Sequence, residues 1–115
     1  MPKTYETSER ATKEFLQTRY YKANAKRVLK FLKEHFEKNN AKIVSYNEEY
    51  NELSICTEMY DMTINVFQFS ISETSVDLFI DSRFLFDFGK TKKIILEFYE
   101  MVGKNFPYIG NALHK

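Results

Sequence analysis

The sequence predicts an α+β fold: a long N-terminal helix, an antiparallel meander of four to five strands, and a C-terminal helix packed on the sheet. Apolar residues recur at helical spacing up to about residue 38 and again from Thr91, and they alternate with polar residues in between. Short polar segments separate the alternating runs, which favours hairpins between antiparallel strands. With 115 residues, the chain is expected to form a single α+β domain over residues 1–115.

The first helix is expected to begin near Thr7 or Ser8, because hydroxyl side chains cap helix N-termini, and to continue to about residue 38, where two asparagines end the pattern. Phe15 and Leu16 fit its apolar stripe poorly, which leaves open a kink near Thr18 or an N-terminal turn with contacts of its own. The stripe that is expected to dock on the sheet consists of Tyr21, Ala25, Val28, Leu32 and Phe36.

Two hairpins are expected after this helix. Residues 41–46 and 53–57 form the first, joined by a polar and acidic loop. Met62–Ile71 and Val76–Ile80 alternate apolar and polar residues and form the second, joined by a loop of two or four residues. The register that gathers their apolar side chains on one face pairs Phe69 with Leu78, Phe67 with Ile80, and Ile71 with Val76.

The first strand of the second hairpin contains a conflict of parity. Met62, Ile64 and Val66 point to the face opposite that of Phe67 and Phe69, so one strand cannot bury both sets on one face. Either a bulge near Val66 turns the chain, or the two ends of the strand are covered on opposite faces.

The C-terminal part is expected to begin with a third strand at residues 84–88, which Gly89 ends. From Thr91, a candidate N-cap, the period changes to that of a helix. Residues 107–115 are expected to fold back through Ile109 and Leu113. The apolar face of the helix, expected to be part of the core, consists of Ile94, Ile95, Phe98, Tyr99, Val102 and Phe106.

Composition and cysteine use favour a soluble cytoplasmic protein. Cys56 is the only cysteine, so the chain cannot form an internal disulfide, and a reducing compartment is the natural reading. The N-terminus has no apolar signal-peptide core, and no apolar run approaches the roughly 20 residues that a membrane span needs. We therefore expect no membrane association.

Charge is strongly segregated along the chain. Residues 1–40 carry ten Lys and Arg against five acidic residues, a net +5, whereas residues 48–87 carry nine acidic residues against Arg83, a net −8. The overall +1 conceals this asymmetry, which bears on the choice of partners rather than on the fold.

Residues suited to catalysis are few, and the chain is not expected to be an enzyme or to hold a metal or cofactor. His35 and His114 are the only histidines, and with one cysteine they form no ligand set at metal spacing. The run from Gly89 to Thr91 suggests a phosphate-binding loop but lacks its first glycine, since position 84 holds Phe84.

The acidic, aromatic half of the sequence is the first candidate site. Asp77 and Asp81 share a strand face with Phe79 between them, a pattern typical of a solvated face rather than of an acid/base pair. Because aromatic residues contribute much of the energy of protein interfaces, we expect a non-enzymatic interaction module, such as a small inhibitor or immunity-type protein, that binds a basic partner. The candidate residues are Tyr46, Glu48, Glu49, Tyr50, Tyr60, Asp77, Phe79 and Asp81.

The basic half gives an alternative, a nucleic-acid-binding accessory protein. Cations spaced three and four residues apart would form a stripe along the expected N-terminal helix, beside its apolar face. The acidic sheet would repel the same polyanion, so this alternative ranks second. The stripe consists of Arg19, Lys22, Lys26, Lys30 and Lys33.

Overall fold

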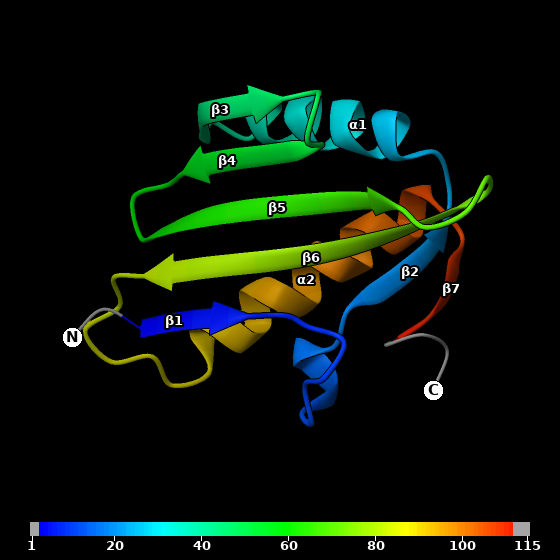
Figure 1. Ribbon diagram of the computed structural model, residues 1–115. Coiled ribbons are helices and arrows are strands. Elements are labelled where there is room, and N and C mark those ends of the chain that lie inside the picture. Colours follow the sequence, from blue (N-terminus) through cyan, green and yellow to red (C-terminus); the bar gives the residue numbers. More distant parts are fainter. Residues whose placement is uncertain (1–2, 112–115) are drawn as a thin grey trace.

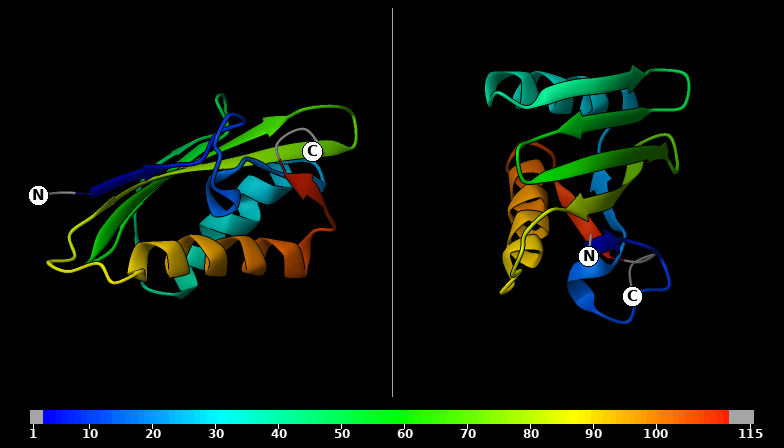
Figure 2. Two further views of the ribbon diagram at one scale, coloured as in Figure 1. Left: turned by 90° about the horizontal axis from the view of Figure 1, so that it is seen from below. Right: turned by 90° about the vertical axis from the view of Figure 1, so that its left-hand side faces the viewer.

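The computed structural model describes residues 3–111 as a seven-stranded antiparallel sheet with two α-helices (Figure 1). Both helices cover the same face of the sheet, as the two further views show (Figure 2). The class is therefore the predicted α+β, with more strands than the four to five expected. In chain order the elements are β1 (Lys3–Glu6), the 3-10 helix η1 (Glu14–Leu16), β2 (Arg19–Lys22), α1 (Ala25–Lys38), β3 (Lys42–Asn47), β4 (Glu52–Cys56), β5 (Tyr60–Gln68), β6 (Glu73–Ser82), α2 (Lys90–Asn105) and β7 (Tyr108–Asn111).

The sheet is organised around β6, its longest strand. The strand order is β3-β4-β5-β6-β2-β7, and β1 also pairs with β6. On the side away from β5, residues 73–76 pair with β2 and residues 79–82 pair with β1. Two strands thus share one side of β6, and residues 7–18 form an excursion between them that leaves the sheet and returns to it.

The prediction of one long N-terminal helix is wrong, because the helix begins only at Ala25. The Asn24 side chain caps it, accepting hydrogen bonds from the backbone N–H groups of Lys26 at 2.9 Å and Arg27 at 3.2 Å. Before this cap the chain forms two short strands and one 3-10 turn. Tyr20 and Tyr21 lie on β2, and both are buried, one on each face of the sheet. Successive residues of a strand point to opposite faces in this way, whereas a single apolar stripe of a helix would not bury both.

The predicted register of the β5–β6 hairpin is also wrong. Val76 pairs with Val66 instead of Ile71. Val66 and Ile71 are an odd number of residues apart, so this shift in register moves every side chain of the strand to the opposite face from the one predicted. The exposed aromatic residues are consequently Phe67, 64% exposed, and Phe69, 46% exposed. The buried set is the other parity: Met62, Ile64 and Val66 on β5, opposite Ile80, Leu78 and Val76 on β6.

No bulge interrupts the pairing of β5 with β6, so the first of the two alternatives for this strand, a bulge near Val66, is wrong. The neighbouring strand explains the choice of face. On β4, Leu53 pairs with Ile64 and Ile55 pairs with Met62, so three adjacent strands present aliphatic side chains to the helices in one register. The first predicted hairpin, at β3 and β4, is confirmed to within one residue at each end.

The C-terminal helix is confirmed as α2, but the strand predicted at residues 84–88 is wrong. That segment is a loop in which Leu85 and Phe88 are 85% and 87% exposed. Gly89, rather than Thr91, is the N-cap residue of α2. The Asp87 side chain accepts the Thr91 N–H at 3.2 Å and the Thr91 hydroxyl at 2.6 Å. After α2 the chain does fold back, as β7 beside β2, while Leu113 lies outside the described residues.

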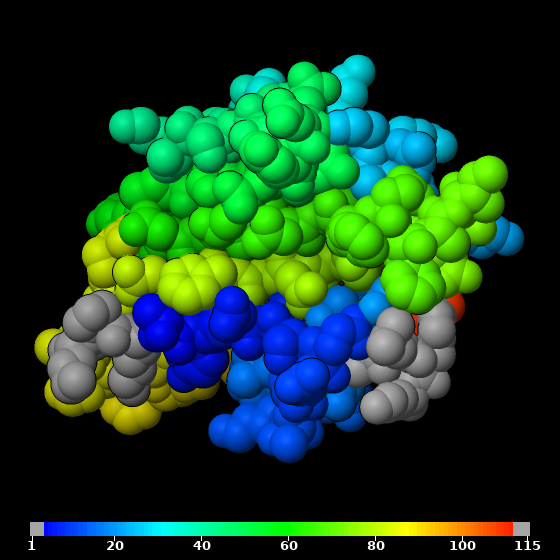
Figure 3. Space-filling view, in the orientation of Figure 1, coloured from blue at the N-terminus to red at the C-terminus, as the bar shows by residue number. Residues whose placement is uncertain are grey.

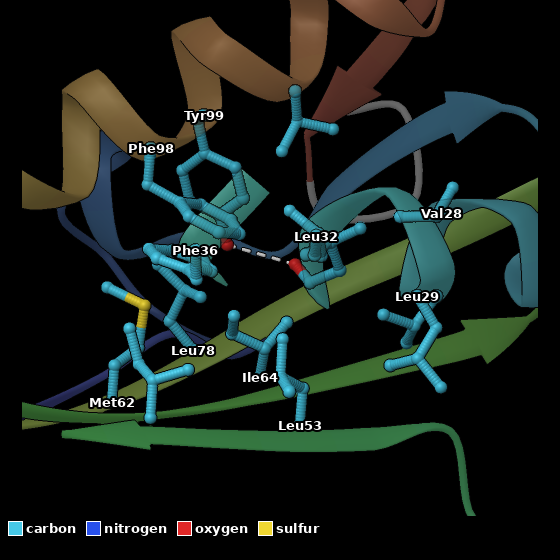
Figure 4. Packing of buried hydrophobic residues seen from close by; sticks show 14 of the residues in the cluster. Val28, Leu29, Leu32, Phe36, Leu53, Met62, Ile64, Leu78, Phe98 and Tyr99 are labelled. Atoms are coloured by element: carbon cyan, nitrogen blue, oxygen red, sulfur yellow. Dashed lines mark hydrogen bonds between the residues drawn. The ribbon is translucent and has the colours of Figure 1, made fainter. Parts of the chain in front are cut away.

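The core lies between the helices and the covered face of the sheet (Figure 4). In the close-up, side chains from α1 and α2 point toward those of β4, β5 and β6. Phe98 stacks on Phe36 with ring centroids 6.3 Å apart, which joins the two helices directly. Tyr99 is buried below and donates its hydroxyl to the Val76 carbonyl at 2.9 Å. The helices therefore depend on the sheet and on each other for burial of their apolar faces.

Candidate protein-docking face

The face of the sheet turned away from the helices carries no helix, and its centre is formed by β5 and β6 (Figures 1 and 3). We call the side chains of these two strands on that side the outer face. Four cross-strand pairs make it up, with rows about 7 Å apart. In order they are Phe67 with Ser75, Asn65 with Asp77, Thr63 with Phe79, and Asp61 with Asp81.

Aromatic rings stand out from the outer face among polar neighbours. Phe67 is 64% exposed and Phe79 is 40% exposed. Phe69, in the hairpin connection, extends the apolar surface and packs edge-on against Tyr20, with ring centroids 5.3 Å apart. The part of these rings that stays exposed would be removed from water if another molecule covered the outer face, which is favourable.

The row of Asp61 and Asp81 forms the acidic end of the outer face. The two carboxylates lie directly opposite each other and repel. Arg83, which donates to Asp61 Oδ2 at 3.0 Å, neutralises the charge of Asp61 and so reduces this repulsion. Hydrogen bonds from Cys56 and from Arg83 lower the pKa of Asp61, so it stays ionised. On the other side, Asp81 Oδ1 is buried and accepts no hydrogen bond within residues 3–111. This row therefore holds one neutralised carboxylate and one with an unused acceptor.

Asp77, in contrast, is a structural carboxylate. Its Oδ1 atom accepts hydrogen bonds from the Thr7 hydroxyl at 2.6 Å and from the Thr18 hydroxyl at 2.7 Å. These residues are the two ends of the excursion between β1 and β2, so one carboxylate closes that segment. Burial raises the pKa of Asp77, and the two hydroxyl donors oppose that shift.

The eight residues of the first candidate site lie in three places. Asp77, Phe79 and Asp81 share the outer face. Glu48, Glu49 and Tyr50 lie exposed at the turn between β3 and β4. Tyr46 and Tyr60 lie on the covered side of the sheet, where both pack against the core.

Two details confirm the placement of these tyrosines on the covered side. Lys33 Nζ lies 5.3 Å from the centroid of the Tyr46 ring, which α1 therefore overlies. Burial raises the pKa of the Tyr60 hydroxyl, as expected for a phenol at the edge of the core. Neither side chain can take part in the outer face.

Sequence reasoning did not place Asp61 and Phe67 on the outer face, nor Phe69 beside it. The error in register assigned both phenylalanines to the core. The parity of Leu53 and Ile55 on the neighbouring strand was the signal that would have found them, because it fixes which β5 residues face the helices.

The basic stripe of the alternative site is not one stripe. Arg19 and Lys22 belong to β2, so only the other three predicted residues lie on α1. Lys26 donates to the Glu48 carbonyl, and Lys33 forms an ion pair with Glu37 at 3.3 Å. The cationic surface of α1 is thus smaller than predicted and partly engaged by the protein itself.

The phosphate-binding interpretation of Gly89 to Thr91 is disfavoured by the hydrogen bonds of Asp87 at the start of α2. Gly89 does adopt a left-handed φ of 81° before the helix, as a phosphate loop would need. The Asp87 carboxylate, however, already accepts from the backbone and the hydroxyl of Thr91. A phosphate at this helix end would meet a negative charge in the place it would have to occupy.

Other features do not assign a function. Within residues 3–111, no three His, Cys, Asp or Glu side chains are grouped so that they could hold a metal ion. His35 lies between the rings of Phe31 and Phe36, and His114 lies outside the described residues. Neither described helix is long and apolar enough to cross a membrane. Comparisons of the chain with protein-family models, curated proteins and solved structures found no match.

Proposed function

We propose that the chain is a non-enzymatic interaction module, such as a small inhibitor or immunity-type protein, whose outer face docks a protein with a basic surface. One observation carries the proposal. An exposed aromatic ring, Phe79, stands on a sheet face that no helix covers, next to Asp81, whose Oδ1 atom has no hydrogen-bond partner within residues 3–111.

The chemistry of this row suits a lysine or arginine of the partner. A cationic donor that reaches the Asp81 carboxylate would form a charge-assisted hydrogen bond, the stronger class of such bonds. The stem of the same side chain would lie against Phe79, where the ring face attracts a cation. A partner surface that extends from these residues along the strands to the Phe67 row would also remove Phe67 from water, which adds the apolar contact that interface centres need.

Long-range charge favours the same partner. The segment 48–87, which contains both strands of the outer face, carries a net charge of −8. Such a field raises the association rate for a basic protein and lowers it for an acidic one, most strongly at low salt. A cytoplasmic location remains part of this proposal and follows only from the sequence.

The experiment is capture of a partner from nuclease-treated lysate of the source cells, followed by binding measurements with variants. Phe79→Ala and Asp81→Lys should each weaken the recovered complex at least tenfold, and Asp81→Lys should also slow association and reduce its salt dependence. Lys30→Glu, on the exposed surface of α1, is the matched control and should leave binding unchanged.

The alternative function predicts the opposite pattern. If α1 binds nucleic acid through Lys26, Lys30 and Lys33, recovery should be sensitive to nuclease and abolished by Lys30→Glu. Phe79→Ala would then have no effect. That pattern would overturn the protein-docking proposal.

A further inference from the structure

A groove runs along α2 on the covered side of the sheet, away from the outer face. It consists of two adjoining cavities of about 670 Å³ and 570 Å³. Arg19 and Leu96 line both, so they mark the place where the cavities meet. The first cavity lies between the start of α2 and the excursion, where Phe15 borders it, and the second lies between the end of α2 and Tyr108 on β7. Both volumes fall in the range of small-molecule sites.

Arg19 occupies a position where this fold otherwise places apolar residues. On β2 it pairs with the buried Val76, so its side chain leaves the sheet on the covered side. Its guanidinium carbon lies 4.6 Å from the centroid of the Tyr99 ring and 5.7 Å from that of Tyr108. These contacts hold the guanidinium at the junction of the two cavities.

Among the described residues, the guanidinium has no ion-pair partner. Its Nε atom is buried and has no hydrogen-bond partner within residues 3–111, and none of the ion pairs there involves Arg19. The side chains nearest to it are neutral: the rings of Tyr99 and Tyr108 lie against it. Burial keeps the pKa of Tyr21 raised despite the opposing effect of Arg19, so that phenol stays protonated, and Asn111, the partner of Arg19 on β7, is an amide. A partly desolvated cation without a counterion is costly, and an anionic ligand would offset that cost.

The charges on the rim decide which anion fits. Lys13 and Lys92 line the first cavity and favour an anion, but two acidic residues, Glu14 and Asp87, line it as well. The Asp87 carboxylate accepts hydrogen bonds from Thr91. In the second cavity, Lys104 is paired with Glu100 at 3.5 Å. With one unpaired guanidinium and acidic groups on both sides, a singly charged carboxylate suits the groove better than a doubly charged phosphate. Arginine also matches the planar, two-oxygen geometry of a carboxylate.

We propose that this groove binds an apolar monocarboxylate, whose carboxylate pairs with Arg19 and whose apolar body lies along Leu96 and Phe15. Leu96 is a large apolar side chain left partly exposed on the groove side of α2, and Phe15 belongs to η1, whose position the excursion sets. The site is separate from the outer face, so each can be tested without the other.

The test is titration of the full chain with decanoate and with benzoate, followed by NMR shifts and calorimetry. Decanol, which has the same chain without the charge, should bind at least tenfold more weakly than decanoate, and inorganic phosphate should not compete. Arg19→Gln should weaken decanoate binding at least tenfold, with Arg19→Lys in between, because lysine keeps the charge but not the paired geometry. Lys22→Gln, an exposed cation on the same strand, is the control and should have no effect.

Leu96→Asp provides a second variant in case Arg19→Gln does not fold. It lies on a helix surface and places a negative charge in the groove, so it should also weaken decanoate binding at least tenfold. Absence of binding of both carboxylates at millimolar concentration would overturn the proposal. Equal binding of decanol and decanoate, undiminished binding to both variants, or tighter binding of phosphate would overturn it as well.

Discussion

Asp77 is the residue whose replacement tests the architecture of the sheet most sharply. Asp77→Ala removes the acceptor shared by Thr7 and Thr18, whose hydroxyls lie 2.6 Å and 2.7 Å from Oδ1. Both threonines are buried, so their donors cannot turn to water without opening the excursion. Each buried donor left unsatisfied costs about 1 to 3 kcal/mol of stability. Because the substitution also removes a desolvated charge, part of this cost is offset, and we expect the free energy of unfolding to fall by about 2 to 4 kcal/mol.

Asp77→Asn separates the hydrogen bonds from the charge. The amide oxygen can still accept both hydroxyls, while the penalty for burying a carboxylate disappears. We therefore expect the free energy of unfolding of Asp77→Asn at pH 7 to lie within about 1 kcal/mol of that of the native chain or above it.

The pH dependence has a definite sign. Burial raises the pKa of Asp77, so the folded state binds this proton more tightly than the unfolded state does. The stabilisation is fully present below the ordinary carboxyl pKa of about 4 and is lost as the pH rises through the higher folded-state pKa. Asp77→Asn should lack this fall in stability.

Urea melts of the native chain and both variants between pH 4 and pH 8 provide the measurement. If Asp77→Ala costs less than about 1 kcal/mol, the carboxylate does not hold the excursion. If Asp77→Asn is as destabilising as Asp77→Ala, the charge itself stabilises the fold and the reasoning from burial is wrong.

Three further substitutions test the core and the loop before α2 by denaturant melts. Phe98→Ala should cost about 3 to 5 kcal/mol, because it leaves a cavity between α1 and α2, and a loss below about 1 kcal/mol would mean that α2 is not docked as described. Tyr99→Phe should cost about 1 to 2 kcal/mol, since it removes the donor to the Val76 carbonyl, and an unchanged stability would show that this carbonyl finds another donor. Phe88→Gly should stabilise the fold by about 0.5 to 1 kcal/mol, because Phe88 is 87% exposed and holds a left-handed φ of 48° that suits glycine; a lower midpoint would indicate that its ring packs usefully.

Local patterns predicted the elements that depend on one strong period. The apolar face of α2 and the hairpin of β3 and β4 could be predicted from the sequence, because in each only one arrangement places the apolar side chains on a common face. For β5 and the residues after it, two registers look equally good, because apolar residues occur at both even and odd positions. The choice is made by contact with β4, a non-local interaction that a pattern within β5 cannot contain.

The N-terminal segment shows a second limit. Residues with good helix propensity continue from about Glu9, but Arg19–Lys22 becomes a strand because the edge of β6 offers it a partner. The cap at Asn24 is a local signal of the true helix start, and it competes with equally plausible caps at Thr7 and Ser8.

The candidate sites inherit these errors. Phe79 and Asp81 were identified because their parity on β6 is unambiguous, whereas Phe67 was hidden by the wrong register. Arg19 was assigned to a helical stripe, and its position between two cavities follows only from the return of β2 and β7 to the sheet. No sequence pattern brings these distant segments together.

Site-specific photo-crosslinking tests the docking face most directly. A benzoylphenylalanine placed at Phe79 or at Phe67, both exposed on the outer face, should crosslink to the same basic protein in nuclease-treated lysate, and Asp81→Lys should suppress both adducts. The same probe at Lys30 on α1 should give no adduct with that protein. Adducts at Lys30 that are lost on nuclease treatment, with none at Phe79 or Phe67, would contradict the account.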